Sequence, residues 1–203
     1  MSPLVQLVVI QPSPFCNIDC KYCYLPGRSV LHRMSLDVME EAWRFLLAQP
    51  DRLAQPLVIA WHAGEPLTVP TAFYERAFTL LAKMAPPGFR VEHWFQTNAM
   101  LIQQEWCDFF RRWNVRVGVS VDGPKWLHDT NRVDRRGKPT HDRVLQGIRY
   151  LQSQNIHFST ITVLTESALD YPDDIWRFFC DLGVTCVAFN LEGVEGENRS
   201  SSL

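Results

Sequence analysis

The sequence lacks several features that would each place a protein in a broad class. Its first apolar run, residues 4–10, is far too short to cross a membrane and has neither the basic flank nor the small-residue cleavage site of a signal peptide. Charge of one sign is not in excess, since the formal net charge is −2 and the basic residues are scattered except between residues 132 and 138. We therefore expect a cytoplasmic protein with no nucleic-acid or membrane partner.

A fourth cysteine is missing beside the three near the N-terminus. Cys16, Cys20 and Cys23 follow C-x3-C-x2-C spacing directly after a strand-like apolar run, and the next cysteine is Cys107. Three thiolates at this spacing can hold three corners of a [4Fe–4S] cluster, whereas a ferredoxin built only for electron transfer supplies four cysteines. The missing ligand leaves one iron open to another molecule, so the pattern predicts a catalytic iron–sulfur site.

Two other interpretations of the cysteines stay open at this stage. Structural zinc needs a fourth nitrogen or sulfur ligand, for which His32 is the nearby candidate. Three disulfides are disfavoured because half of the six cysteines lie within eight residues. Cys107, Cys180 and Cys186 lie in apolar contexts, and we expect them to be buried packing thiols.

Composition and periodicity predict one α/β domain. The chain has 203 residues and is 46% hydrophobic, which suffices for a sizeable core, and we expect disorder only in the tail. The expected strands span residues 4–11, 57–61, 90–96, 116–121, 157–163 and 187–190. The expected helices span residues 35–48, 70–85, 103–113, 140–154 and 171–182, with Ser35 as an N-cap and Pro172 in a first turn. Six strands alternating with five helices indicate a parallel sheet, either open or curled into a partial (β/α)6 barrel.

Residues that could bind a ligand or take part in a reaction follow four of the expected strands. Parallel α/β folds place their functional sites at these carboxyl ends. After the second strand, His62-Ala63-Gly64-Glu65-Pro66 lets the backbone approach a ligand, although a tight turn with a solvated Glu65 is the simpler interpretation of this motif alone. Ser120 can donate a hydrogen bond after the fourth strand, and Arg132 offers a bidentate partner for a carboxylate. A barrel brings these strand ends to one point and is therefore favoured.

Taken together, these motifs resemble those of the radical S-adenosylmethionine (SAM) enzymes. The cysteine loop matches their cluster motif, and His62-Ala63-Gly64-Glu65-Pro66 resembles their Gly-Gly-Glu-Pro motif with one alanine. The segments around Cys20–Tyr24, Gln96–Asn98 and Val119–Pro124 resemble the branch that modifies proteins and peptides and includes the anaerobic sulfatase-maturating enzymes. The resemblance implies a [4Fe–4S] cluster held by the three cysteines, with SAM bound by Tyr22, Gly64, Glu65, Ser120, Arg132 and Leu191. It implies no catalytic residue beyond the cluster.

A narrower resemblance is to the cyclophane-forming maturases that act on glycine-rich-repeat precursor peptides. It rests on residues 24–29, 33–35 and 195–203 and implies that a 5′-deoxyadenosyl radical abstracts hydrogen from a peptide β-carbon, which then couples to an aromatic ring. It also implies a one-electron reductant such as flavodoxin or ferredoxin. Relatives carry a C-terminal cysteine-rich SPASM domain with auxiliary clusters, so we expect residues 1–190 to form the partial barrel and residues 191–203 to begin a missing SPASM region.

Alternative functions remain open. Formylglycine formation, as in sulfatase maturation, shares the first stage of the reaction and differs in the substrate. The chain can also be a fragment that holds a cluster and SAM without turning over, or a simple electron-transfer module. Release of 5′-deoxyadenosine without peptide distinguishes such a fragment from an active enzyme that lacks its substrate, and metal and sulfide content identifies a simple zinc or electron-transfer module.

Overall fold

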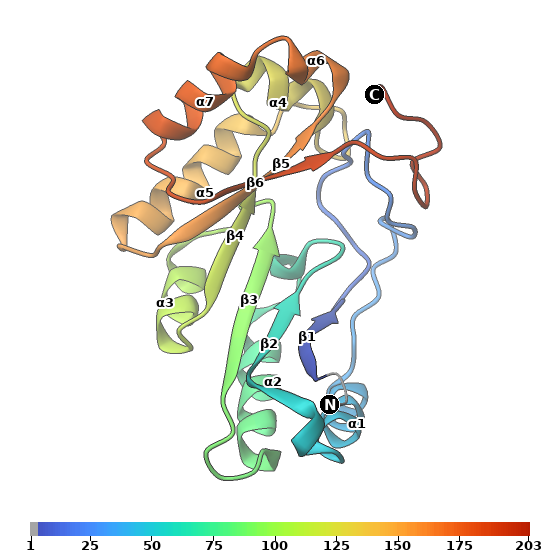
Figure 1. The fold of residues 1–203 in the computed structure, drawn as a ribbon, viewed down its shortest axis with the longest axis vertical. Coiled ribbons are helices and arrows are strands. Elements are labelled where there is room, and N and C mark those ends of the chain that lie inside the picture. Colours follow the sequence, from blue (N-terminus) through green and yellow to red (C-terminus); the bar gives the residue numbers. More distant parts are fainter. Residues whose placement is uncertain (1–3) are drawn as a thin grey trace.

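Six parallel strands form one curled sheet in the protein, whose structure is a computed structural model describing residues 4–203. The strands are β1 (Val5–Ile10), β2 (Leu53–Trp61), β3 (Val91–Thr97), β4 (Arg116–Ser120), β5 (Phe158–Leu164) and β6 (Val187–Leu191). They pair in sequence order, and Figure 1 shows the sheet curling with its helices on the outer side. The predicted partial barrel is confirmed, and all six carboxyl ends lie at one edge of the sheet.

The helices cover the outer face of this half-barrel. They are α1 (Leu36–Leu47), α2 (Thr71–Met84), α3 (Gln104–Arg112), α4 (Lys125–Asn131), α5 (His141–Ser153), α6 (Glu166–Leu169) and α7 (Pro172–Asp181), with 3-10 turns η1 (Pro50–Arg52) and η2 (Pro66–Thr68). The five predicted helices are present. Sequence periodicity missed α4 and α6 because helices of seven and four residues are too short to show a repeating apolar stripe.

Two helix starts have the predicted chemistry. The Ser35 hydroxyl accepts a hydrogen bond from the Val38 amide at 3.2 Å, which satisfies one of the free N–H groups at the start of α1. Pro172 occupies the first turn of α7, where its missing N–H costs nothing. These caps fix where the chain leaves the cysteine loop and where α7 begins.

The core between the sheet and the helices is rich in aromatic side chains. The Trp61 ring of β2 lies 5.1 Å from that of Tyr74 in α2, and the Tyr74 ring lies 4.8 Å from that of Phe95 in β3. All three are at most 1% exposed. Because side chains alternate along a strand, residues next to these, such as His62 and Gln96, face the concave side of the sheet.

The two long irregular segments lie side by side in Figure 1. The cysteine loop, residues 12–34, joins β1 to α1, and the C-terminal tail, residues 192–203, follows β6 and lies beside it. The tail is ordered by contacts: the Glu197 amide donates to the Tyr24 carbonyl at 2.9 Å. Gly196 allows this approach, since a Cβ there would lie 2.2 Å from the Tyr24 oxygen.

The expectation of buried packing thiols is correct for one cysteine of three. Cys107 is buried in α3, whereas Cys180 and Cys186 are exposed. Cys180 follows the buried Phe179 in α7, and a step of one residue around a helix turns the next side chain toward solvent. Cys186 lies in the connection before β6, outside the packed layers.

Among residues 4–203 the structure contains no helix with the length and apolar character needed to cross a membrane. The expected division into residues 1–190 and 191–203 places its boundary at the end of β6, and its residues 1–3 lie outside the described part of the chain.

Candidate functional site

The three motif cysteines lie in the cysteine loop at the carboxyl edge of the sheet. Cys20 is buried, Cys16 and Cys23 are half-buried, and all three are free thiols. The Cys23 amide donates to the Cys20 carbonyl at 3.2 Å, which closes a turn around the last two cysteines. The predicted ligands are therefore gathered in one compact loop that needs no disulfide to hold it.

Hydrogen-bond donors from outside the cysteine loop reach two of the thiols. Asn98 Nδ2, from the end of β3, lies 3.9 Å from Cys16 Sγ, and Arg132 Nη1 lies 3.9 Å from Cys20 Sγ. Burial raises the pKa of Cys16 to about 12 and that of Cys20 to about 11, so both are neutral thiols without iron. Donors aimed at sulfur stabilise cluster-bound thiolates, and the donor set fits a [4Fe–4S] cluster.

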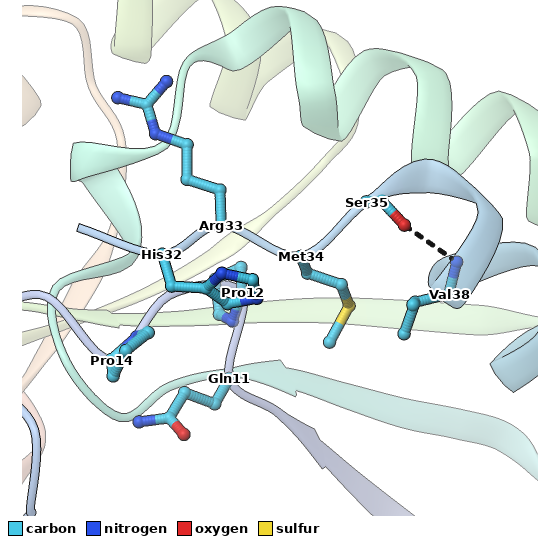
Figure 2. Close-up of a pocket in the computed structure, with 8 residues that line it drawn as sticks. All are labelled: Gln11, Pro12, Pro14, His32, Arg33, Met34, Ser35 and Val38. Atoms are coloured by element: carbon cyan, nitrogen blue, oxygen red, sulfur yellow. Dashed lines mark hydrogen bonds between the residues drawn. The ribbon is translucent and has the colours of Figure 1, made fainter. Parts of the chain in front are cut away.

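The structure gives no support to a zinc site at the same residues. His32 lines a pocket of about 410 Å³ with Gln11, Pro12 and Pro14, and no cysteine contributes to its wall (Figure 2). Across residues 4–203, no three or more His, Cys, Asp and Glu side chains come together around a point that could hold a single metal ion. A cubane cluster binds its three thiolates at three different irons, so the thiols need not converge.

Gly64 lets the turn after β2 pack directly on the cysteine loop. Its φ is +67°, and a Cβ there would lie 2.4 Å from the Ser13 carbonyl oxygen and 2.8 Å from that of Phe15. The next amide, of Glu65, donates to the Phe15 carbonyl at 2.8 Å. Only glycine combines this backbone conformation with so close an approach, so the turn positions the loop that carries Cys16.

The Glu65 side chain points into the protein rather than into solvent. It is 1% exposed, and its carboxylate accepts hydrogen bonds from the Asn98 amide at 2.7 Å, the Thr97 hydroxyl at 2.6 Å and the Leu67 amide at 3.0 Å. Burial raises the pKa of Glu65 to about 7, although these donors favour the ionised form. The interpretation of a solvated Glu65 is wrong: its carboxylate joins the ends of β2 and β3.

Ser120 lies at the end of β4 on the concave side, within reach of the end of β3. Gln96 Nε2 donates to the Ser120 hydroxyl at 2.9 Å. The Gln96 side-chain amide passes over Gly118 on its way to Ser120. A larger residue at Gly118 would block it, since a Cβ there would lie 2.2 Å from Gln96 Oε1. The hydroxyl of Ser120 therefore has a fixed acceptor role toward Gln96 and a proton free for a ligand.

Arg132 and Tyr22 share one buried carboxylate, that of Asp122. Arg132 Nε and Nη2 each lie 2.9 Å from an oxygen of Asp122, and the Tyr22 hydroxyl donates to the same group. The Arg132 and Asp122 side chains are only 7% and 2% exposed. Burial raises the pKa of Tyr22, which keeps its hydroxyl a donor. Only Nη1 of Arg132 lies outside this ion pair, directed at Cys20.

Leu191 lies apart from these residues. It is the last residue of β6, is 71% exposed, and by strand alternation it shares a face with Phe189, whose ring lies 6.4 Å from Phe179 of α7. The other predicted site residues come together at the carboxyl ends of β1 to β4. Their association with SAM stays a prediction.

Sequence reasoning gave no role to three residues that the structure places at the site. Asp122 enters the sequence analysis only as part of the segment Val119–Pro124, yet in the structure its carboxylate binds both Arg132 and Tyr22. Arg135 binds the Cys16 carbonyl through Nη1 at 3.3 Å, a contact that joins segments more than a hundred residues apart and leaves no local signal. His62 Nδ1 is buried and has no hydrogen-bond partner within residues 4–203, on the concave side beside Gly64. This nitrogen is available to a ligand. In the sequence, only the position of His62 directly after Trp61 at a strand end marks it.

Comparison with known proteins agrees with this arrangement. Residues 10–179 match the family model of the radical SAM superfamily. An uncharacterized protein of Synechocystis sp., sll1766, is 44% identical over 97% of the chain and 50% of its own length. A serine-type anaerobic sulfatase-maturating enzyme of Bacteroides thetaiotaomicron is 34% identical over 90% of the chain and 45% of its own length.

Solved structures show the same fold. The structure of anSMEcpe with bound AdoMet and a Kp18Cys peptide superposes with a TM-score of 0.86 at 25% identity, covering 95% of the chain and 52% of its own. SuiB of Streptococcus suis, solved with its precursor peptide SuiA, superposes with a TM-score of 0.70 at 17% identity, covering 96% and 40%. The chain thus spans about half the length of the curated relatives and solved structures that it matches.

Proposed function

The chain belongs to the radical SAM superfamily, and from this premise we propose that it holds a [4Fe–4S] cluster and SAM at the carboxyl edge of its half-barrel and modifies a peptide side chain. The observation that carries the proposal is the convergence of three separate segments on the cysteine loop. Asn98 at the end of β3 approaches Cys16, Arg132 after α4 approaches Cys20, and Gly64 after β2 packs on the loop backbone. Thiols, donors and a glycine turn from separate units meet there.

When bound, the cluster and SAM together supply a 5′-deoxyadenosyl radical that removes hydrogen from an unactivated carbon. Within the chain, Cys16, Cys20 and Cys23 would hold iron. The structures of anSMEcpe with bound AdoMet support a SAM site in the same fold. The packed core between the sheet and its helices would keep water from reaching that site through the outer face of the sheet.

Four residues are proposed to bind SAM directly or through the backbone. The Ser120 hydroxyl and the backbone around Gly64 face the concave side beside the cysteine loop and fit such contacts best. Glu65 would act by holding the turn beside Gly64, because its carboxylate is bound to three donors and its amide to the Phe15 carbonyl. Arg132 could reach a carboxylate only through Nη1, since its other donors hold Asp122.

Two further residues have narrower proposed roles. The Tyr22 hydroxyl is bound to Asp122, so its contribution would be to fix Arg132 beside Cys20 or to offer its ring. Leu191 would reach adenine only over the exposed end of β6, because strand alternation places its side chain on the face that packs against α7. Both assignments follow motif positions and are separable by single substitutions.

For the substrate we propose a ribosomally made peptide whose side-chain β-carbon loses hydrogen and couples to an aromatic ring, giving a cyclophane. The coupling forms one carbon–carbon bond, transfers one hydrogen atom to the 5′-deoxyadenosyl group and releases one further electron and one proton. An auxiliary iron–sulfur cluster in a C-terminal SPASM segment would accept that electron. Support for a peptide substrate comes from solved relatives with bound peptides, among them anSMEcpe.

Formylglycine formation is the second candidate, and the curated relatives favour it. Serine-type and cysteine-type anaerobic sulfatase-maturating enzymes are 34% and 27% identical to the chain. Both candidates begin at a β-carbon, so they differ only in the fate of the carbon radical. A hydrazide probe labels an aldehyde product and leaves a cross-linked peptide unlabelled, which separates them.

The decisive experiment is anaerobic reconstitution with iron and sulfide, reduction with dithionite, and assay of 5′-deoxyadenosine from SAM. We expect product from the wild type and none from the Cys16→Ala, Cys20→Ala or Cys23→Ala variants, whose iron content should fall. Cys180→Ala is the matched control, because this cysteine is exposed on α7 and should be dispensable.

The outcomes are distinct. A full cluster retained in all three ligand variants contradicts the cluster assignment. A wild-type chain that carries the cluster and binds SAM, yet releases no 5′-deoxyadenosine, is a binding fragment and not an initiator of radical chemistry.

A further inference from the structure

The short basic run noted in the sequence forms a hydrogen-bonded hairpin on the surface. This basic hairpin, residues 133–139, closes through an antiparallel bridge between Val133 and Pro139. The Asp134 carboxylate accepts hydrogen bonds from the amides of Arg136 at 2.8 Å and Lys138 at 2.9 Å. These bonds lower the pKa of Asp134 and use its side chain to hold the turn.

The basic hairpin lies directly against the cysteine loop. The Asp19 amide donates to the Val133 carbonyl at 2.8 Å, and Ile18 bridges Asp134 in antiparallel fashion. Arg135 Nη1 then reaches the carbonyl of the ligand residue Cys16 at 3.3 Å. One strand of the hairpin therefore forms the outer wall of the segment that carries the cysteines.

The positive charges of the basic hairpin are presented to solvent. Arg136 and Lys138 are exposed, and neither forms an ion pair with any residue in the described range 4–203. Exposed Lys21 continues the patch, since its amide donates to the Asn131 carbonyl at 3.0 Å just before the hairpin. The chain as a whole has a net charge of −2, so these exposed cations form a local concentration of positive charge beside the cysteines.

We propose that the basic hairpin, together with Lys21, is the docking surface for an acidic one-electron carrier protein that reduces the cluster. The inference rests on the proposed function, which requires an electron at the cysteine loop. Complementary charge steers an acidic partner to this face and raises its association rate. A carrier seated here lies against the backbone of the ligand-bearing loop, which gives the electron a short path through bonded and hydrogen-bonded atoms.

The test uses the reconstituted chain and a fluorescently labelled flavodoxin as an acidic probe. Arg136→Glu with Lys138→Glu reverses both exposed charges and leaves the hairpin intact, because its turn is held by backbone amides. Arg136→Gln with Lys138→Gln removes the two charges without reversing them and serves as the intermediate variant. Arg52→Glu with Lys83→Glu is the control, since these exposed residues precede β2 and end α2, at the opposite edge of the sheet, and change the net charge equally.

We expect the charge-reversed hairpin to bind flavodoxin about tenfold or more weakly at low ionic strength, the neutral variant to fall between, and the control to stay within about twofold of wild type. Wild-type affinity should drop as salt rises, since screening acts over about 10 Å at 0.1 M salt. Reduction of the cluster by flavodoxin should slow in the same order, followed by its visible absorption, while reduction by dithionite is unchanged.

Several results would overturn the inference: equal weakening in the hairpin and control variants, hairpin variants that bind like wild type, or a wild-type chain that does not bind flavodoxin. An oligonucleotide that binds the hairpin as tightly as flavodoxin would show a general polyanion surface and would also overturn it. If flavodoxin binds as expected and SAM is not cleaved with dithionite, the docking surface stands and the proposed function falls.

Discussion

Replacing Gly64 by alanine tests whether the turn after β2 positions the cysteine loop. The substitution adds one methyl group at a residue with φ +67°, directed at the Ser13 and Phe15 carbonyl oxygens. Gly88→Ala is the matched control: Gly88 has φ +79°, and nothing lies within 4 Å of its would-be Cβ. The two variants thus share the backbone penalty and differ only in the steric clash.

The magnitudes follow from these distances. An alanine in the left-handed region costs about 1–2 kcal/mol, which both variants incur. A Cβ at 2.4 Å from a backbone oxygen cannot be accommodated without moving one of the two loops, and overpacking of this kind costs about 1–3 kcal/mol more. Gly64→Ala should therefore be less stable than Gly88→Ala by about 1–3 kcal/mol.

Urea denaturation under anaerobic conditions measures the difference. With a slope of about 2 kcal/mol/M, the midpoint of Gly64→Ala should lie about 0.5–1.5 M below that of Gly88→Ala. Iron content and the electron paramagnetic resonance of the reduced cluster should change in Gly64→Ala alone, because only that turn contacts the loop of Cys16. Equal midpoints and identical cluster spectra in the two variants would refute the positioning role.

Three further substitutions test other parts of the site. Within residues 4–203, Asp122 is the only carboxylate paired with buried Arg132, so Asp122→Asn should cost about 3–5 kcal/mol in urea denaturation; a near-neutral change would mean that the ion pair is not formed. Burial raises the pKa of Glu65 from 4.5 to about 7, so the folded chain holds this proton more tightly than the unfolded chain; wild-type stability should fall as pH rises from about 4.5 to 7, and Glu65→Gln should lack that part of the slope. Identical pH profiles would contradict the buried, titrating carboxylate. Gly196→Ala should push the tail away from the Tyr24 carbonyl and speed hydrogen exchange in residues 192–198, and unchanged exchange would show that the contact is not maintained in solution.

The strands and long helices could be predicted because each buries a repeating apolar pattern. Expected and observed strand bounds agree within a residue or two except at β2, which begins at Leu53 and not at residue 57. Among the added residues Leu53 pairs with Val5 before the register shifts, whereas Gln55 and Pro56 interrupt the apolar pattern and hide this part of the strand from sequence reasoning. Short α4 and α6 depend on the strands that they connect and have too few turns to show a period.

The parts of the candidate site that could be predicted are those marked by a short local pattern of one residue type. A cysteine triplet and a small-residue turn are local patterns, and the structure places both at the same strand edge. Asp122 was not identifiable, because its role depends on Arg132 ten residues later and on Tyr22 a hundred residues earlier. The direction of Glu65 likewise depends on donors from the end of β3, which no local pattern of the sequence reveals.

The irregular cysteine loop is held by contacts from segments that follow several strands of the half-barrel. The turn at Gly64 contacts it from β2, Asn98 from β3, Arg135 from the segment after β4, and Gly196 from the tail after β6. Since the loop has almost no regular structure of its own, it should be ordered only when the sheet has formed from β1 to β6. Cluster assembly should therefore report on the folding of the whole half-barrel, and a substitution far along the chain, such as one at Gly196, can loosen the cysteines without touching a ligand.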